Sequence, residues 1–391
     1  MNDFERAQAL SHELLEHRRY FHTNAEAGLH MPKAKAYVME KLREYGLEPQ
    51  ECGEGVTATL GHGGRVIMLR ADMDALPMPE ESGLPFACPT GEQAHACGHD
   101  FHAAMLLTAA KLLKEDEASL PGTVKLMFQP AEETFEGSRN MIEHGILENP
   151  KPDVALAYHV SPGRLPIGTY LYNDTGTMMF SVDTFEIHIQ GKGSHGAYPH
   201  LSIDPINIGT HIYLALQELI ARESDPSDAC LLTVGQFTAG TAANIIPDTA
   251  VLKGTMRTNK KEAREKLLRR LKEVSEATAA VYGGSASVVF TCSVPTLVCD
   301  PALTKEIVGF MTELPIPGAV GYSGISASAS EDFALIAERV PSAFMYLSAG
   351  YADERGDYPA HHPKVQFNED VLPIGAAYLA HCAVRWLEEH R

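Results

Sequence analysis

One eight-residue stretch, His95-Ala96-Cys97-Gly98-His99-Asp100-Phe101-His102, constrains this chain more than any other. It holds three imidazoles, a thiol and a carboxylate, and an apolar, small-residue run over 103–113 follows it directly. His and Cys are the side chains that hold borderline divalent metals such as Zn²⁺, and Gly98 allows a tight turn between two ligands. The stretch therefore predicts metal ligands at the start of a helix. The alternative is a loop in which Asp100 merely caps that helix.

The length and charge of the chain limit the class of protein. Its 391 residues exceed one ordinary core, so we expect two domains. A composition of 45% apolar and 21% charged residues is typical of a soluble globular protein. The formal net charge of −19 argues against nucleic acid or an anionic membrane surface as a partner, and no apolar run approaches membrane-spanning length.

The cysteines and the N-terminal residues bear on the cellular compartment. The seven cysteines are odd in number and scattered, which does not suggest a disulfide framework and favours a reducing compartment. The first residues are charged and lack the apolar region of a secretory signal. We therefore expect a cytoplasmic protein.

Three predicted strands each lead into ionisable residues. Strands alternate with helices in this part of the chain, which indicates an α/β sheet with both faces covered. Open α/β sheets place their sites at the carboxyl ends of the strands. The strands and the residues that follow them are 66–69 with Asp72 and Asp74, 124–128 with Glu132 and Glu133, and 154–158 with His159.

Residues 182–293 carry a different pattern. Their predicted elements follow the order β-α-β-β-α-β, which is the ferredoxin-like arrangement, and such a unit can be inserted into another domain because its ends lie close together. After residue 293 the alternation of strands and helices resumes, and this part of the chain includes the loop with His361. We expect a discontinuous catalytic domain, residues 1–181 and 294–391, whose mixed, mostly parallel sheet is covered by helices, and an inserted domain over 182–293.

The ionisable residues of the strand ends and motif loops form one candidate centre. So many acidic and ligand-type groups in one cleft would repel one another unless cations neutralised them. Two metals that share a ligand would meet this requirement and make a water nucleophilic at neutral pH. The residues concerned are Asp72, Asp74, Cys97, His99, Glu132, Glu133, His159 and His361.

The residue patterns leave some of these roles open. Adjacent Glu132 and Glu133 cannot easily both face one ion, so one can bind metal while the other acts as general base. A Glu-Glu pair is otherwise usually solvent-exposed. His159 could equally be a core histidine, and His361 could lie on the surface.

Six motifs, taken in chain order, resemble the dinuclear metallo-amidohydrolases. That family includes hippurate hydrolase, bacterial N-acyl-amino-acid amidohydrolases and plant auxin-conjugate hydrolases, and is related to aminoacylase and carboxypeptidase G. The motifs are Arg70-Ala71-Asp72-Met73-Asp74-Ala75-Leu76-Pro77, the stretch 95–102, Phe128-Gln129-Pro130-Ala131-Glu132-Glu133, Gly191-Lys192-Gly193-Ser194-His195-Gly196-Ala197, Asn244-Ile245-Ile246-Pro247 and Ser330-Glu331-Asp332-Phe333.

The resemblance implies a role for each matching metal-site residue. Cys97 would bridge two divalent metals, Zn, Mn, Co or Ni, with His99 and His159 completing one site and Glu133 and His361 completing the other. Glu132 matches the general base, and Asp74 matches a carboxylate that orients a ligand.

The resemblance also implies roles for residues of the inserted domain. His195 matches a histidine that reaches the active site of the other subunit in family dimers and stabilises the oxyanion. The resemblance therefore implies a homodimer in which the inserted domain is the dimerisation or lid domain. Asn244 and Arg257 match residues that contact the substrate carboxylate, and Arg257 offers a bidentate fork for it.

The implied activity is hydrolysis of N-acyl amino acids to a carboxylate and a free amino acid, with Glu132 acting on a metal-activated water. The alternatives are a dipeptidase or carboxypeptidase, which commonly has Asp where Cys97 stands, and an inactive binding protein. The chain departs from the family pattern at Ala25-Glu26-Ala27, at Thr134-Phe135-Glu136-Gly137 and at Val365 and Gln366, where an aromatic residue and an acid are usual. None of these departures removes a proposed ligand.

Overall fold

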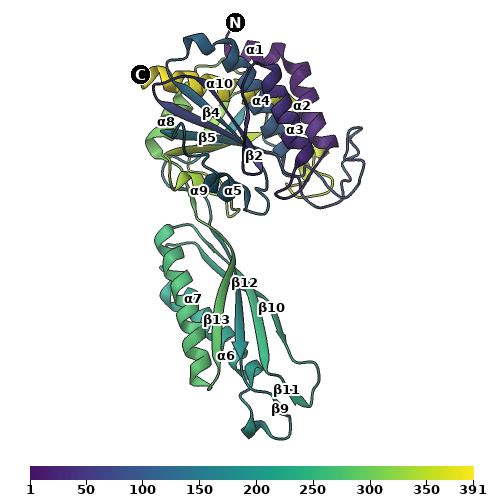
Figure 1. Ribbon diagram of the computed structural model, residues 1–391, viewed down its shortest axis with the longest axis vertical. Helices are drawn as coiled ribbons and strands as arrows, with labels where there is room; N and C mark the ends of the chain where they lie inside the picture. The colour runs from purple at the N-terminus through teal and green to yellow at the C-terminus, as the bar shows by residue number, and fades with distance from the viewer. The chain divides into compact units, whose positions relative to one another are not determined.

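The computed structural model describes residues 1–391 and divides them into two units (Figure 1). The first unit contains Met1–Met178, Val298–Ile325 and Leu335–Arg391, and the second contains Met179–Leu297 with Ser326–Ala334. The predicted insertion, residues 182–293, lies within the second unit, and its role as a dimerisation or lid domain stays a prediction. No helix in the chain combines the length and apolarity needed to cross a membrane.

An eight-stranded sheet forms the centre of the first unit. Its strands are β1 (Gln50–Cys52), β2 (Gly55–Gly61), β3 (Val66–Asp72), β4 (Thr123–Gln129), β5 (Val154–Ser161), β6 (Thr169–Tyr172), β15 (Val320–Tyr322) and β16 (Ser342–Ser348). They lie in the order β1-β2-β4-β3-β5-β16-β6-β15. The central run β4-β3-β5-β16 is parallel, whereas β1 and β2 pair antiparallel at one edge. The predicted mixed, mostly parallel sheet is thus confirmed.

Helices from both ends of the chain cover this sheet (Figure 1). They are α1 (Asp3–Ala9), α2 (Ser11–Thr23), α3 (Pro32–Glu44), α4 (His99–Glu115), α5 (Gly137–Glu143), α8 (Pro301–Met311), α9 (Ala334–Ala337) and α10 (Leu372–Glu389). Helix α4 packs against α2, α10 and β3, and its run 103–110 is buried without interruption. The apolar stretch after the first motif is therefore a central core helix.

Side chains of β3 alternate between the main apolar core and the other face of the sheet. Ile67, Leu69 and Ala71 belong to the main core, whereas Met68, Arg70 and Asp72 are also buried but lie outside it. Successive side chains of a strand point to opposite faces. The polar residues of β3 therefore lie on the sheet face opposite the main core.

The second unit has a four-stranded antiparallel sheet with two helices. Its elements are β8 (Val182–Gln190), α6 (Pro205–Glu218), β10 (Cys230–Ala239), β12 (Thr249–Thr258), α7 (Lys261–Val281) and β13 (Ser285–Val294). The strand order is β10-β12-β8-β13, and apolar residues of the sheet pack against α6 and α7 in one core. The predicted β-α-β-β-α-β order is present in this unit. A small two-stranded sheet joins β9 (Ser194–His195) to β11 (Ile245–Ile246).

One predicted element is much shorter than expected. We predict a helix opening at Glu331, but α9 spans only Ala334–Ala337. The Glu331 carboxylate accepts the backbone N–H of Phe333 at 2.9 Å. A side chain that binds nearby backbone groups competes with the helical hydrogen bonds, so the chain turns before the helix begins.

Candidate metal centre

Gly98 sets the geometry of the first motif. It adopts φ 91° and is the N-cap of α4, a left-handed conformation that glycine reaches without steric cost. A Cβ added there would lie 2.4 Å from Val160 Cγ2. The tight turn places Cys97 just before α4 and His99 as its first residue. Asp100 lies inside the helix and is not its cap.

The first donor cluster contains Cys97, His99 and His159, whose ligand atoms lie within 4.8 Å of one another. His159 lies within β5, not after it, and its Nε2 is 3.5 Å from Cys97 Sγ. Its Nδ1–H donates to the carbonyl of Val160 at 2.7 Å. In the neutral ring, Nε2 therefore has a lone pair directed toward the sulfur.

The second donor cluster contains Cys97, Glu133 and His361 and meets the same 4.8 Å limit. His361 Nε2 lies 3.4 Å from Glu133 Oε1. Cys97 belongs to both clusters, so a single thiolate can bridge two ions. The structure brings together all five ligands implied by the resemblance.

Asp74 orients two parts of this centre at once. Its Oδ1 accepts from His99 Nδ1 at 3.2 Å, and its Oδ2 accepts the backbone N–H of Glu133 at 3.0 Å. The first contact leaves His99 Nε2 as the metal-facing atom. A carboxylate behind a ligating imidazole is the usual support in metal sites.

Two buried polar atoms of the centre test whether a cation fits it. His99 Nε2 and Glu133 Oε1 make no hydrogen bond, and the 3.4 Å contact of Glu133 Oε1 with His361 Nε2 is an ion pair only. His99 Nε2 lies 3.8 Å from Asp72 Oδ2, 3.9 Å from Glu133 Oε1 and 4.0 Å from Glu132 Oε2. Buried polar atoms are normally satisfied, and the N, S and O donors are those of a borderline divalent ion. The residues present therefore fit a pair of such ions.

Burial and neighbouring charges shift the proton affinities of the ligands. Burial and the nearby Glu133 carboxylate raise the pKa of Cys97 to about 12. Burial lowers the pKa of His159, and the imidazoles of His102 and His99 lower it further. Burial alone would raise the pKa of Glu133, but His361 and His99 lower it overall. Cation binding to Cys97 must therefore displace a proton from the thiol.

Asp72 supports the centre through a network that includes Arg70 and His102. Its Oδ2 accepts from Arg70 Nη1 at 2.6 Å, and its Oδ1 accepts from His102 Nδ1. His102 Nε2 in turn accepts the backbone N–H of Val160 at 2.8 Å. Sequence reasoning missed Arg70. Its position two residues before Asp72, on the same face of β3, was the available signal.

His95 and Asp100 are buried next to the centre but belong to neither donor cluster. Burial lowers the pKa of His95 to about 3, so this imidazole stays neutral. Asp100 Oδ2 lies 2.8 Å from His22 Nδ1 and 2.8 Å from Arg18 Nε on α2. Asp100 therefore joins α4 to α2.

The second unit contains the other three predicted site residues. His195 pairs with Ile245 in the β9-β11 sheet, and Gly196 N–H donates to the carbonyl of Asn244 at 2.8 Å. His195 Nδ1 accepts from Ala197 N–H at 3.0 Å, so in the neutral ring Nε2 carries the proton. His195 and Asn244 are thus neighbours on an exposed part of this unit.

Arg257 lies at the other end of the same unit. It is near the C-terminal end of β12. At the start of β12, Thr249 pairs with Gln190, and the β9 segment follows Gln190 in the chain. At about 3.4 Å per residue, the eight-residue separation along β12 is about 27 Å. One copy of the chain therefore keeps Arg257 apart from His195 and Asn244.

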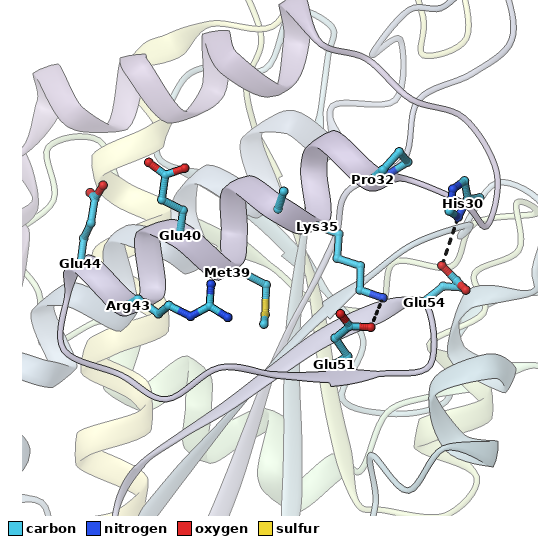
Figure 2. Close-up of a pocket in the computed structure, with 10 residues that line it drawn as sticks. His30, Pro32, Lys35, Met39, Glu40, Arg43, Glu44, Glu51 and Glu54 are labelled. Atoms are coloured by element: carbon cyan, nitrogen blue, oxygen red, sulfur yellow. Dashed lines mark hydrogen bonds and ion pairs between the residues drawn. The ribbon is translucent and has the colours of Figure 1, made fainter.

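A separate surface hollow of about 800 Å³ lies beside α3 (Figure 2). Charged side chains line it and pair across it, with Lys35 Nζ 2.8 Å from Glu51 Oε2 and His30 Nδ1 3.4 Å from Glu54 Oε2. None of its lining residues belongs to the donor clusters.

Comparison with known proteins finds a family match over most of the chain. The family model described as Peptidase family M20/M25/M40 matches residues 68–385. An N-acetyl-L-cysteine deacetylase of Bacillus subtilis is 35% identical over 387 residues, covering 97% of this chain and 90% of that protein. The IAA-amino acid hydrolase ILR1-like 2 of Arabidopsis thaliana is also 35% identical, over 396 residues, covering 99% and 88% respectively.

A solved structure from the same family is also similar to this chain. A dinuclear metal-binding peptidase of the M20 family from Bacillus subtilis superposes with a TM-score of 0.82 at 33% identity. The alignment covers 97% of this chain and 99% of that one.

Proposed function

This chain belongs to peptidase family M20/M25/M40 and is a hydrolase of the amidohydrolase type, and we propose that it cleaves the amide bond of N-acyl amino acids. The products are a carboxylate and a free amino acid. The observation that carries the proposal is the pair of three-donor clusters that share Cys97, with the Glu132 carboxylate 4.0 Å from His99 Nε2.

Cys97, His99 and His159 would hold one divalent ion, and Cys97, Glu133 and His361 the other. Two such ions supply a polarised carbonyl and a water of lowered pKa. The donor set suits Zn, Co or Ni and tolerates Mn. Asp74 holds His99 and the Glu133 backbone in the arrangement that this centre requires.

Glu132 serves as the general base. Its side chain is buried near His99 and is not needed to complete either Cys97 cluster. It takes a proton from the attacking water as the oxygen bonds to the carbonyl carbon. The same proton then passes to the nitrogen of the leaving amine as the C–N bond breaks.

Arg257 and Asn244 bind the substrate carboxylate, and His195 donates a hydrogen bond to the oxyanion. Arg257 uses Nη1 for Thr255 and Met256, at 2.9 and 3.3 Å, and its Nε and Nη2 make no hydrogen bond. Those two groups form the edge that recognises a carboxylate.

A homodimer reconciles the positions of these three residues. Arg257 lies about 27 Å along β12 from Thr249, and His195 and Asn244 lie beyond the Thr249 end of that strand. This is too far for all three to serve one small substrate from a single chain. A second copy can supply the missing pair, and a symmetric dimer then completes two equivalent sites.

A substrate comparison tests the proposed activity. The metal-loaded enzyme is assayed for released amine on a panel of N-acetyl and N-benzoyl amino acids beside the matching dipeptides. We expect faster turnover of the N-acyl compounds. Faster cleavage of the dipeptides would favour a peptidase, and no turnover of any compound with Zn, Mn, Co or Ni would favour an inactive binding protein.

A further inference from the structure

We propose that His22 and Gln366 are positioning residues. Through the loop 73–98 they hold the segment 361–366, and with it the ligand His361, in place. This inference rests on the metal centre proposed above. It concerns residues outside both donor clusters and predicts an effect on only one of the two ions.

His22 is a buried bridge between two carboxylates. Its Nδ1 lies 2.8 Å from Asp100 Oδ2, and its Nε2 lies 2.9 Å from Glu80 Oε1. The shorter contact at each nitrogen is to a carboxylate, which favours an imidazolium that donates from both, whereas the Arg18 Nη2 donor lies farther away, 3.3 Å from Nδ1. His22 therefore links α4, through Asp100, to the middle of the loop 73–98, through Glu80.

Glu80 also binds other residues of the loop 73–98. Its Oε1 also accepts from the Ser82 hydroxyl, and its Oε2 accepts the backbone N–H of Cys88 at 3.2 Å. The Phe86 ring packs edge-on against His22, with 5.3 Å between ring centroids. The His22–Glu80 pair thus stabilises the part of the loop around Ser82.

The same loop holds the segment that contains His361. Glu81 N–H donates to the carbonyl of Pro363 at 2.7 Å, and Gln366 Nε2 donates to the carbonyl of Ser82 at 2.7 Å. Nearer the metal centre, His361 N–H donates to the carbonyl of Ala96 at 2.9 Å. A carboxylate at position 366 has no N–H and could not donate to Ser82.

His361 needs this support because of its own conformation. It adopts φ 66°, a left-handed conformation that strains any residue other than glycine. Its side chain is 52% exposed, so core packing alone does not fix it. The hydrogen bond of its own N–H to Ala96 and the bonds of the residues after it to Glu81 and Ser82 restrict it to the ligand position.

Metal titration of the full chain tests the proposal. Metal-free wild type, His22→Gln and Gln366→Met are dialysed against graded Zn²⁺, and bound zinc per chain is measured by elemental analysis. We expect two ions on the wild type. Each variant should bind one of them with unchanged affinity and the other about 10- to 100-fold more weakly, as is typical when support of a ligand is lost. Excess Zn²⁺ should restore the second ion.

Matched controls separate positioning from general damage. His12→Gln changes an exposed histidine of the same helix, and Lys364→Gln changes an exposed residue of the fastened segment; both should bind zinc as the wild type does. If both Gln366→Met and His22→Gln are folded and bind two ions at wild-type affinity, the inference is wrong. If the wild type itself binds no pair of ions, the proposed centre is what fails. Gln366→Met keeps the test available if His22→Gln does not fold.

Discussion

His99 Nε2 lies 3.9 Å from Glu133 Oε1, and both atoms are buried and make no hydrogen bond, although Glu133 Oε1 has an ion-pair contact with His361 Nε2 at 3.4 Å. The two residues belong to different donor clusters that share Cys97. Leaving a buried polar atom unsatisfied costs about 1–3 kcal/mol. A divalent ion bound to each side chain would satisfy both atoms, so the fold and the metal centre should depend on each other.

Metal removal should therefore destabilise the first unit. A ligand that binds only the folded state stabilises it by about 2.7 kcal/mol at 100 times its dissociation constant. We expect the melting temperature to fall after dialysis against a chelator and to recover when Zn²⁺ or Mn²⁺ is added. A melting temperature that changes neither on chelation nor on addition of metal would contradict a resident metal centre.

Glu132→Gln should separate catalysis from metal binding. The amide keeps the shape of the side chain but cannot accept the proton of water, so turnover should fall by roughly two to four orders of magnitude. Glu132 lies close enough to His99 and Glu133 to form a donor group with them, but both Cys97 clusters keep their three donors without it, so metal content should stay at the wild-type value. Glu136→Gln, an exposed change in the same loop, is the matched control. Near-normal turnover of Glu132→Gln would show that Glu132 is not the general base.

Cys97→Ser should reduce the bound metal of both clusters. Serine is a poor ligand at neutral pH, and the bridging position is common to the two ions. We expect fewer than two ions per chain by elemental analysis at limiting metal, with activity reduced in parallel. Two ions bound at unchanged affinity would make Cys97 a core residue only.

The buried His22 pair should contribute to stability in a pH-dependent way. Burial alone would lower the pKa of His22, but its hydrogen bonds to Asp100 and Glu80 raise it above the ordinary value of 6.5. The contribution is then fully present below about pH 6.5 and is lost as the pH rises through the raised pKa.

We therefore expect His22→Gln to lower the melting temperature of the metal-free chain most near pH 6 and progressively less at alkaline pH. The loss near pH 6 should be about 3 kcal/mol, because one partner of a buried ion pair is removed. The other charged or titratable groups near the ring are Arg18 and His95. A pH-independent difference from wild type would show that His22 acts through packing alone.

The metal ligands that lie close together in the chain were the easiest to predict. Cys97 and His99 share one motif, and the positive φ of Gly98 explains why both can face one centre. His159 and His361 were grouped with the centre from a strand end and a loop, but core and surface alternatives stayed open, and their roles as ligands depended on family resemblance. The register of β5 and the left-handed backbone of His361 are tertiary features that residue spacing does not encode.

The supporting residues were harder to predict than the ligands. Asp72 was grouped with the candidate centre, but its oxygens are engaged by Arg70 and His102. Nothing in the local sequence indicates that His22, on α2, meets Asp100 and Glu80, because such pairs form only when distant elements pack. The short strands β1, at one edge of the sheet, and β6, next to the other edge strand, were also missed, since three or four residues carry little periodic signal.

Mixing two inactive variants should test whether His195 acts across a dimer. Glu132→Gln removes the base but keeps His195, and His195→Ala removes the oxyanion donor but keeps Glu132. If His195 of one copy serves the centre of the other, a mixed dimer contains one complete site. Random exchange makes about half of the dimers mixed, so activity should return to about a quarter of the wild-type value. No recovery after proven subunit exchange, or full activity of a species that sediments as a monomer, would rule out the action of His195 in a second copy.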